Sequence, residues 1–183
     1  PGKTVLVVGS GIAGLLHIHL AKAMGAGKVI STDISNYRLR AAKRFGADIS
    51  INANEYSVQA LRSQNQGRLA DLVIVSTGSP IAINQALESV ERGGTILFFA
   101  PTEKDRKVPL SFNELFWRTE ISLTSSYAGS PSDYKEALNL IAMKKIDVSS
   151  MLTHRLSLSE TGIGFKIVAE AQESIKVIIY PQK

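Results

Sequence analysis

The 183-residue sequence contains no cysteine. This absence excludes disulfides and thiol-based catalysis within the chain, and it removes the thiolate ligands that many zinc sites use. No apolar run reaches the roughly 20 residues that a membrane-spanning helix needs, and no secretory signal pattern stands at the N-terminus. We therefore expect a protein with no membrane segment. The cysteine-free composition is compatible with the cytoplasm, where we expect the protein to act.

Histidine is also scarce, and the net charge is small. The formal net charge is only +5, and the basic residues are dispersed along the chain, so we expect no nucleic-acid partner. The three histidines are His17, His19 and His154. His17 and His19 are two residues apart on an expected helix, so they face different directions and cannot form a metal pair. Because a catalytic zinc needs three protein ligands, the chain supplies no credible zinc site.

The most informative feature lies between residues 4 and 33. An apolar run, TVLVVGS, leads into a glycine-rich turn, Gly9-Ser10-Gly11-Ile12-Ala13-Gly14, and after a helix-forming stretch KVISTD ends in Asp33. This order of strand, glycine turn, helix, strand and acid is typical of a dinucleotide-binding unit. Asp33 follows the last glycine at close to the ~20 residues expected of an acid that bonds the adenosine ribose.

Each glycine of the turn has a distinct expected role. Gly9 permits the tight turn, and Gly11 lets the backbone approach a pyrophosphate at the N-terminus of the helix. Gly14 allows the helix and the strand to pack closely. A glycine motif alone is weak support. The strand before it, the helix after it and the position of Asp33 favour dinucleotide binding over an ordinary βαβ turn.

Strand-like and helix-like segments alternate along most of the chain. This alternation predicts an α/β fold with a doubly wound, six-stranded parallel sheet of the Rossmann type and helices on both faces. The continuous apolar runs VLVV, LVIV and ILFF fit strands buried on both faces. We expect the strands at residues 4–9, 28–33, 48–52, 71–76, 95–100 and 121–127.

The remaining residues, 128–183, predict a C-terminal helical tail with a final strand, KVIIY, that has no obvious place in the six-stranded sheet. We therefore divide the chain into an NAD(P)-binding core, residues 1–127, and this tail. Gly162 and Gly164 fall in the last expected helix, where glycine costs about 0.5–1 kcal/mol relative to alanine, so we expect that helix to be poorly ordered.

Four segments carry a family resemblance: PGKTVLVVGSGIAGLLHIHLAKAMGAGKVISTD, RLRAAKRFGAD, DLVIVSTGSPIAINQALESVERGGTILFFA and DYKEALNLIAMKKIDVSSMLTHRLSL. Together they resemble the medium-chain, zinc-type alcohol dehydrogenases, especially the polyol (sorbitol-type) and threonine dehydrogenase branch. The resemblance covers the second half of such an enzyme. It implies a preceding GroES-like catalytic domain that holds the zinc, and a parent enzyme that oxidises a secondary alcohol or polyol with NAD. The chain alone is then expected to bind cofactor without turnover.

The resemblance also implies which residues bind the cofactor. The glycine turn would face the pyrophosphate, Asp33 the ribose, and Ile34 the adenine, while Arg38 would lie beside the ribose. We expect NAD rather than NADP, because a carboxylate at Asp33 repels a 2′-phosphate, although Arg38 softens that repulsion. The full set of expected cofactor-binding residues is Gly9, Gly11, Ile12, Ala13, Gly14, Asp33, Ile34, Arg38, Thr77, Gly78, Ala100 and Ser126.

Two other functions share these features. A regulatory module that senses NAD(H) without catalysis has the same glycine turn and acid, and a methyltransferase binds S-adenosylmethionine with a similar loop. We also expect a homodimer, formed through the edge of the strand that begins at Ile121 and ends at Tyr127. The aromatic segment from Phe112 to Trp117 either packs under that strand or contributes to the subunit interface.

Overall fold

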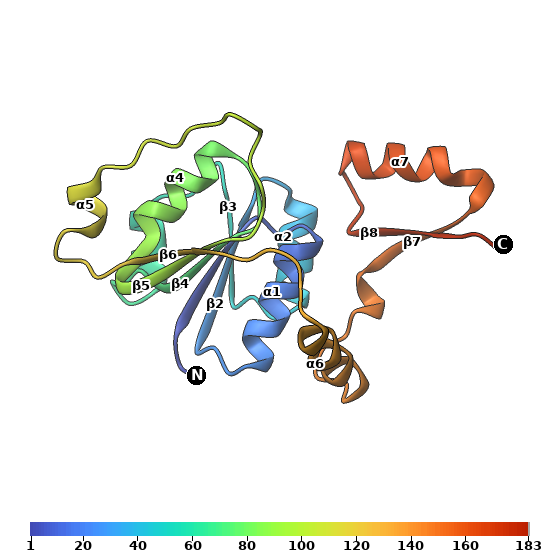
Figure 1. Cartoon of the computed structure of the whole chain (residues 1–183), viewed down its shortest axis with the longest axis horizontal. Helices are drawn as coiled ribbons and strands as arrows, with labels where there is room; N and C mark the ends of the chain where they lie inside the picture. The colour runs from blue at the N-terminus through green and yellow to red at the C-terminus, as the bar shows by residue number, and fades with distance from the viewer. Residues whose placement is uncertain (183) are drawn as a thin grey trace. The chain divides into compact units, whose positions relative to one another are not determined.

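The structure, a computed structural model, describes residues 1–182, which divide into two compact units. The first unit spans Pro1–Ala128 and the second begins at Gly129. The first contains a six-stranded parallel sheet with strand order β3-β2-β1-β4-β5-β6 (Figure 1), which confirms the predicted Rossmann-type α/β fold. Its strands are β1 (Thr4–Val8), β2 (Lys28–Asp33), β3 (Ile49–Asn52), β4 (Ala70–Val75), β5 (Val90–Phe98) and β6 (Ser122–Ser125).

Helices cover both faces of this sheet (Figure 1). Alternate residues of β1 point to opposite faces. Leu6 and Val8 join the apolar core beneath α3 (Val58–Gln64) and α4 (Pro80–Ser89). Val5 and Val7 are equally buried on the other face, where α1 (Ile12–Ala23) and α2 (Asn36–Arg44) pack. This two-sided burial is why the central strands are continuously apolar.

The strand order changes direction between β1 and β4. From β1 the chain moves outward to β2 and β3, then crosses back to add β4, β5 and β6 on the other side. The connections that follow β1 and β4 therefore diverge at the carboxyl edge of the sheet. In open parallel sheets, ligands bind in the crevice at such a point.

The aromatic segment after β5 is only partly packed. Leu115, in the short helix α5 (Phe112–Phe116), is buried, whereas Phe112 and Trp117 are 73% and 68% exposed. The expectation that the segment packs under the last strand is therefore wrong for these two aromatic residues, whereas Leu115 is buried. A helix of five residues presents only one of its sides to the sheet, so its other side chains stay at the surface.

The second unit contains α6 (Pro131–Ala142), α7 (Thr161–Glu170), two short 3₁₀ turns (Ser149–Met151 and Leu158–Glu160), and the parallel strands β7 (Leu152–Ser157) and β8 (Lys176–Tyr180). Ser130 and Asp133 form a capping box that starts α6. The final strand, β8, lies outside the six-stranded sheet, as expected, and pairs with β7. Helix α7 forms the crossover that this parallel pair requires.

The glycines of α7 also have a packing explanation. Gly164 is buried, and a Cβ atom there would lie 3.3 Å from the side chains of Leu156 and Ile179. Glycine therefore lets α7 lie close to the two-stranded sheet, and Thr161–Glu170 is helical as expected. No atom lies within 4 Å of a Cβ at Gly162.

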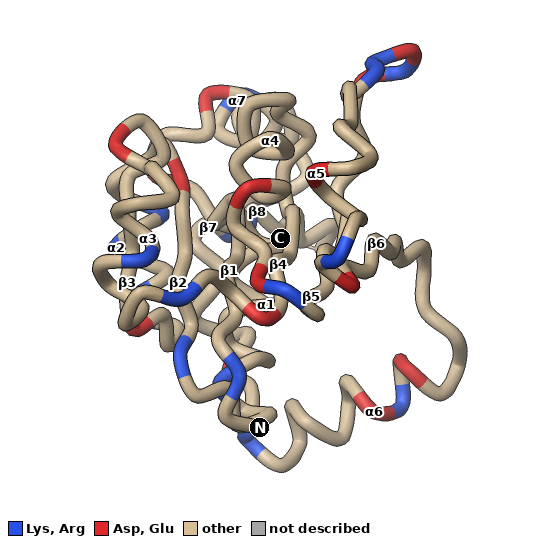
Figure 2. The backbone as a smooth tube through the Cα atoms, turned by 90° about the vertical axis from the view of Figure 1, so that its left-hand side faces the viewer, with Lys and Arg blue, Asp and Glu red and all other residues tan. Residues whose placement is uncertain are grey.

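Charged residues are interspersed along the backbone in both units rather than gathered in one stretch (Figure 2). Within residues 1–182, no helix is long and apolar enough to cross a membrane.

Candidate functional site

The glycine turn joins β1 to α1 at the carboxyl edge of the sheet. Gly9 has φ +92°, a conformation that L side chains rarely adopt, and a Cβ atom there would lie 3.2 Å from the carbonyl oxygen of Ser76. A Cβ at Gly14 would lie 1.9 Å from the carbonyl oxygen of Gly9. Glycine is therefore required at both positions to let α1 begin this close to β1.

Gly11 differs from the other two glycines. It is the N-cap of α1, its φ of −68° is open to any residue, and nothing lies within 4 Å of a Cβ placed there. No side chain caps the helix, and no acidic residue lies in its first turn. The N-terminus of α1 is therefore left without a side-chain cap or an acidic neighbour, as in an anion-binding helix N-terminus.

Asp33 is held in a fixed orientation at the end of β2. The side chain is buried, and its Oδ2 accepts a hydrogen bond from the backbone N–H of Ser10 at 2.8 Å. Its Oδ1 accepts one from the N–H of Ser35, also at 2.8 Å. Because each carboxylate oxygen has a second lone pair, Asp33 can still accept from two hydroxyl groups of a ligand.

A cavity of about 280 Å³, which we call the glycine-turn cavity, lies among these elements. Its walls come from the glycine turn, the ends of β2 and β4, the loop after β3, and α4. Six of the residues predicted from the sequence line it: Gly9, Gly11, Asp33, Ile34, Arg38 and Thr77.

The other predicted residues lie elsewhere. Ile12, Ala13 and Gly14 form the first turn of α1. Gly78 lies against the loop after β5, where a Cβ atom would stand 2.4 Å from the carbonyl oxygen of Pro101. Ala100 and Ser126 line a separate hollow of about 570 Å³ beside the ends of β5 and β6. Eight of the twelve predicted residues thus line two hollows at the same edge of the sheet, and the other four line neither.

Buried polar atoms give the glycine-turn cavity its chemical character. Three side-chain atoms in residues 1–182 are buried without a hydrogen-bond partner: Thr32 Oγ1, Arg38 Nε and Ser76 Oγ. All three residues line this cavity. Buried polar groups are normally paired, so the clustering fits a polar ligand that supplies both donors and acceptors.

Apolar side chains flank the same cavity. Ile34, directly after β2, and Ile81, in α4, are 71% and 72% exposed, and both line the hollow. Two exposed aliphatic surfaces on one cavity fit the faces of a planar ring. The residues present therefore suit a dinucleotide, which combines an aromatic base with ribose hydroxyls and phosphates.

Sequence reasoning missed several residues of this cavity, among them Thr32, Ser76, Ile81 and Gln85. The first two stand at the carboxyl ends of predicted strands, so the rule that ligands bind at this edge could have found them. No local motif marks Ile81 or Gln85, which reach the cavity through the packing of α4.

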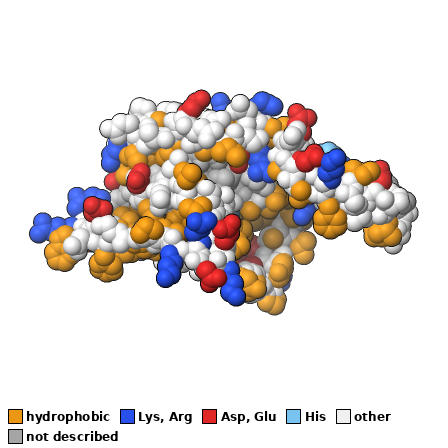
Figure 3. All heavy atoms as spheres, turned by 90° about the horizontal axis from the view of Figure 1, so that it is seen from above, with side chains coloured by type: hydrophobic (Ala, Val, Ile, Leu, Met, Phe, Trp, Pro, Cys, Tyr) orange, Lys and Arg blue, Asp and Glu red, His pale blue; other side chains and the backbone are white. Residues whose placement is uncertain are grey.

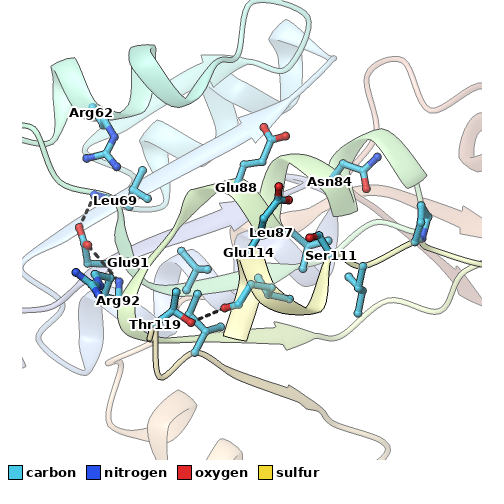
Figure 4. A pocket seen from close by; sticks show the side chains of 15 residues that line it. Arg62, Leu69, Asn84, Leu87, Glu88, Glu91, Arg92, Ser111, Glu114 and Thr119 are labelled. Atoms are coloured by element: carbon cyan, nitrogen blue, oxygen red, sulfur yellow. Dashed lines mark hydrogen bonds between the residues drawn. The ribbon is translucent and has the colours of Figure 1, made fainter. Parts of the chain in front are cut away.

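A further hollow of about 530 Å³ lies at the opposite, amino edge of β4 and β5 (Figure 4). The carboxylate of Glu91, which lines this hollow, accepts hydrogen bonds from the backbone N–H groups of Leu69 at 2.9 Å and Arg92 at 3.1 Å. The hydrogen bond from Leu69 is the main reason that the pKa of Glu91 is lowered. Glu91 thus joins the starts of β4 and β5, and we assign this hollow a structural role.

No metal centre is assembled in the described part of the chain. Groups of three or more His, Cys, Asp or Glu side chains placed to hold a metal are absent from residues 1–182. His17 is half-buried and meets the ring of Phe99 edge-on, with ring centroids 4.6 Å apart. His154 lies in β7, with Nδ1 3.0 Å from Thr153 Oγ1. These residues do not fit a zinc site.

The family of this chain is shown by its similarity to known proteins. Residues 13–143, more than half of the chain, match the zinc-binding dehydrogenases. The chain belongs to this family. The resemblance to zinc-type dehydrogenases predicted from the sequence is therefore confirmed.

Two relatives of this zinc-binding dehydrogenase chain belong to the predicted branch. Sorbitol dehydrogenase of Bacillus subtilis (strain 168) is 30% identical over 189 aligned positions, which cover 100% of this chain and 52% of that enzyme. L-threonine 3-dehydrogenase of the same organism is 32% identical, with 98% of this chain and 52% of that enzyme covered. The chain spans about half the length of the curated relatives it matches.

A solved structure adds a ligand-bound comparison. A zinc-binding dehydrogenase of Sinorhizobium meliloti 1021, bound to NADP, superposes with a TM-score of 0.88 at 25% identity. The superposition covers 98% of this chain and 53% of that protein.

Proposed function

We propose that this chain is the cofactor-binding part of a zinc-binding dehydrogenase and that it binds an adenine dinucleotide in the glycine-turn cavity. The observation that carries the proposal is the set of unpartnered, buried polar atoms of Thr32, Arg38 and Ser76 beside the glycine turn and Asp33. A ligand with hydroxyl and phosphate groups satisfies all of them, whereas an apolar ligand satisfies none.

Each wall of the cavity takes one part of the dinucleotide in this proposal. The pyrophosphate occupies the space at Gly11, against the N–H groups of Ile12 and Ala13. Asp33 accepts hydrogen bonds from the adenosine ribose hydroxyls, and Ile34 covers one face of the adenine. The nicotinamide end extends toward Ala100 and Ser126. Gly14 and Gly78 act indirectly, by keeping the neighbouring backbone segments close.

We further propose that NAD binds more tightly than NADP. A 2′-phosphate would lie beside the carboxylate of Asp33, whose orientation is fixed by the N–H groups of Ser10 and Ser35, so like charges would repel. Arg38 lines the same cavity and reduces this repulsion. The preference is therefore a matter of degree, and a relative bound to NADP shows that the family admits the second cofactor.

The parent reaction is proposed to be oxidation of a secondary alcohol or polyol, as the names of the sorbitol and threonine dehydrogenase relatives suggest. When bound, NAD accepts the hydride removed from the alcohol carbon. The residues of this chain bind and orient the cofactor for that step. The second unit, from Gly129 onward, is proposed to complete a catalytic domain that holds the zinc. Cytoplasmic location is part of the same proposal.

Two measurements test the proposed function. Isothermal titration calorimetry of the purified chain should detect NAD binding, and absorbance at 340 nm should detect no NADH formation with sorbitol or threonine. Binding without turnover is expected because residues 1–182 bring together no metal-binding group. Alcohol oxidation by the pure chain would overturn the second half of the proposal.

We also propose that the chain forms a homodimer through the edge of β6. This strand is the last of its sheet and pairs on one side only, with β5. Tyr127, just beyond it, is 99% exposed, and Phe112 and Trp117 are also largely exposed. Figure 3 shows apolar side chains at the surface among charged ones. Light scattering should give twice the 19.8 kDa chain mass; a monomer at high concentration would contradict the proposal.

A further inference from the structure

One polar side chain of the glycine-turn cavity has an orientation that the fold fixes. Gln85 lies in α4, and its Nε2 donates a hydrogen bond to the carbonyl oxygen of Ala53, 3.3 Å away in the loop after β3. A carbonyl oxygen only accepts hydrogen bonds, so the amide nitrogen, and not the amide oxygen, must face Ala53. The amide oxygen, Oε1, accepts no hydrogen bond from any residue described in this structure, although Gln85 lines the cavity.

The position of Gln85 relates it to the base rather than to the ribose or the pyrophosphate. Asp33 and the glycine turn define where ribose and pyrophosphate lie, and Ile34 continues the wall beyond Asp33. Ile81, the second exposed isoleucine of the cavity, precedes Gln85 by one turn of α4. Residues i and i+4 lie on the same face of a helix. A ring that packs against Ile81 therefore lies next to Gln85 on the same side of the cavity.

We propose that Gln85 recognises the adenine by accepting a hydrogen bond from its 6-amino group at Oε1. This inference rests on the proposed function and adds to it the residue that selects the base. The 6-amino group is a donor, whereas hypoxanthine carries a carbonyl oxygen, an acceptor, at the same position. The site therefore distinguishes adenine from hypoxanthine dinucleotides, and it does so equally for NAD and NADP, which share the adenine.

A simpler role for Gln85 is to tie α4 to the loop after β3 through Ala53. That role uses only Nε2, so it predicts no discrimination between the two bases. The base-selecting role uses Oε1 and predicts discrimination. The affinity ratio for two ligands in the same protein separates these roles, since a change in folding alters both affinities together.

The experiment compares NAD with nicotinamide hypoxanthine dinucleotide by calorimetric titration of the whole chain. A neutral hydrogen bond has a net worth of about 0.5–1.5 kcal/mol, which is roughly 2–13-fold in affinity. With hypoxanthine, Oε1 of Gln85 would also face a second acceptor, the carbonyl oxygen of the base, which adds to this difference. We therefore expect the wild type to bind NAD at least ~5-fold more tightly than nicotinamide hypoxanthine dinucleotide. Gln85→Met keeps the length of the side chain but has no acceptor oxygen, and it should bind both ligands within about twofold.

Gln59→Met is the matched control, because Gln59 is exposed on α3 and does not line the cavity. It should keep the wild-type ratio. Gln85→Ala provides the same test as Gln85→Met if the longer side chain impairs folding. Equal affinities in the wild type, or an unchanged ratio in both Gln85 variants, would overturn the role of Gln85 and leave dinucleotide binding standing. Failure of the wild type to bind either ligand would overturn both proposals.

Discussion

Alanine substitutions at Gly11 and Gly14 separate cofactor binding from folding, although the two glycines are only three residues apart. The Cβ atom of Gly14→Ala would lie 1.9 Å from the carbonyl oxygen of Gly9 and 2.9 Å from its carbonyl carbon. Both neighbours are backbone atoms, so α1 must shift away from the turn. Overpacking of this kind costs about 1–3 kcal/mol. For a chain of this size that corresponds to a Tm lower by roughly 2–12 °C.

Gly11→Ala meets no such obstacle. No atom lies within 4 Å of the added Cβ, and the φ of −68° suits alanine. Alanine is a poorer N-cap than glycine by at most about 1 kcal/mol, so we expect a Tm decrease of no more than ~4 °C. The methyl group does, however, occupy the space proposed for the pyrophosphate. We expect NAD affinity to fall at least about tenfold, which is ~1.4 kcal/mol.

Differential scanning calorimetry measures the two Tm values, and isothermal titration calorimetry measures the affinities. The expected pattern is a binding defect with near-normal stability for Gly11→Ala and a stability defect for Gly14→Ala. Wild-type NAD affinity in Gly11→Ala would refute the placement of the pyrophosphate. An unchanged Tm in Gly14→Ala would refute the packing argument for the turn.

Three other changes test separate parts of the account. Asp33→Ser should raise the affinity for NADP relative to NAD, measured by titration with both, and an unchanged ratio would contradict the role of this carboxylate. Burial lowers the pKa of His17 below its ordinary 6.5, so the unfolded chain takes up a proton first as the pH falls. Urea unfolding should therefore show a free energy of unfolding that decreases from pH 7.5 to pH 5.5. The decrease should be smaller in His17→Gln. An identical pH dependence in the two proteins would rule out His17 as its cause. Asn65→Leu removes hydrogen bonds with Thr4 Oγ1 and with the carbonyl oxygens of Arg68 and Leu69. Chemical denaturation should show a free energy of unfolding lower by about 2–4 kcal/mol. A decrease under about 1 kcal/mol would contradict the role of these hydrogen bonds.

The first unit could be predicted closely because its signals are local. Continuous apolar runs identify strands buried on both faces, and the glycine turn and Asp33 belong to one strand–helix–strand unit. The bond from Ser10 N–H to Asp33 gives the physical reason: the turn and the acid are fixed to each other by neighbouring strands. The order of six strands then follows from the usual connections of such a sheet.

The features that sequence reasoning missed depend on tertiary packing. Ile81 and Gln85 reach the cavity only because α4 packs beside β4, and nothing in the local pattern shows this. The pairing of β7 with β8 was missed because the two strands are joined through a whole helix. From sequence alone, Gly164 is expected to destabilise α7, whereas in the structure its missing side chain makes room for Leu156 and Ile179.

We propose above all that the cavity beside Gly11 and Asp33 binds an adenine dinucleotide. The most direct test is a calorimetric titration of the purified chain with NAD, NADP and S-adenosylmethionine in parallel. We predict binding of NAD, weaker binding of NADP, and no binding of S-adenosylmethionine. Binding of S-adenosylmethionine in preference to NAD, or no binding of either dinucleotide, would contradict it.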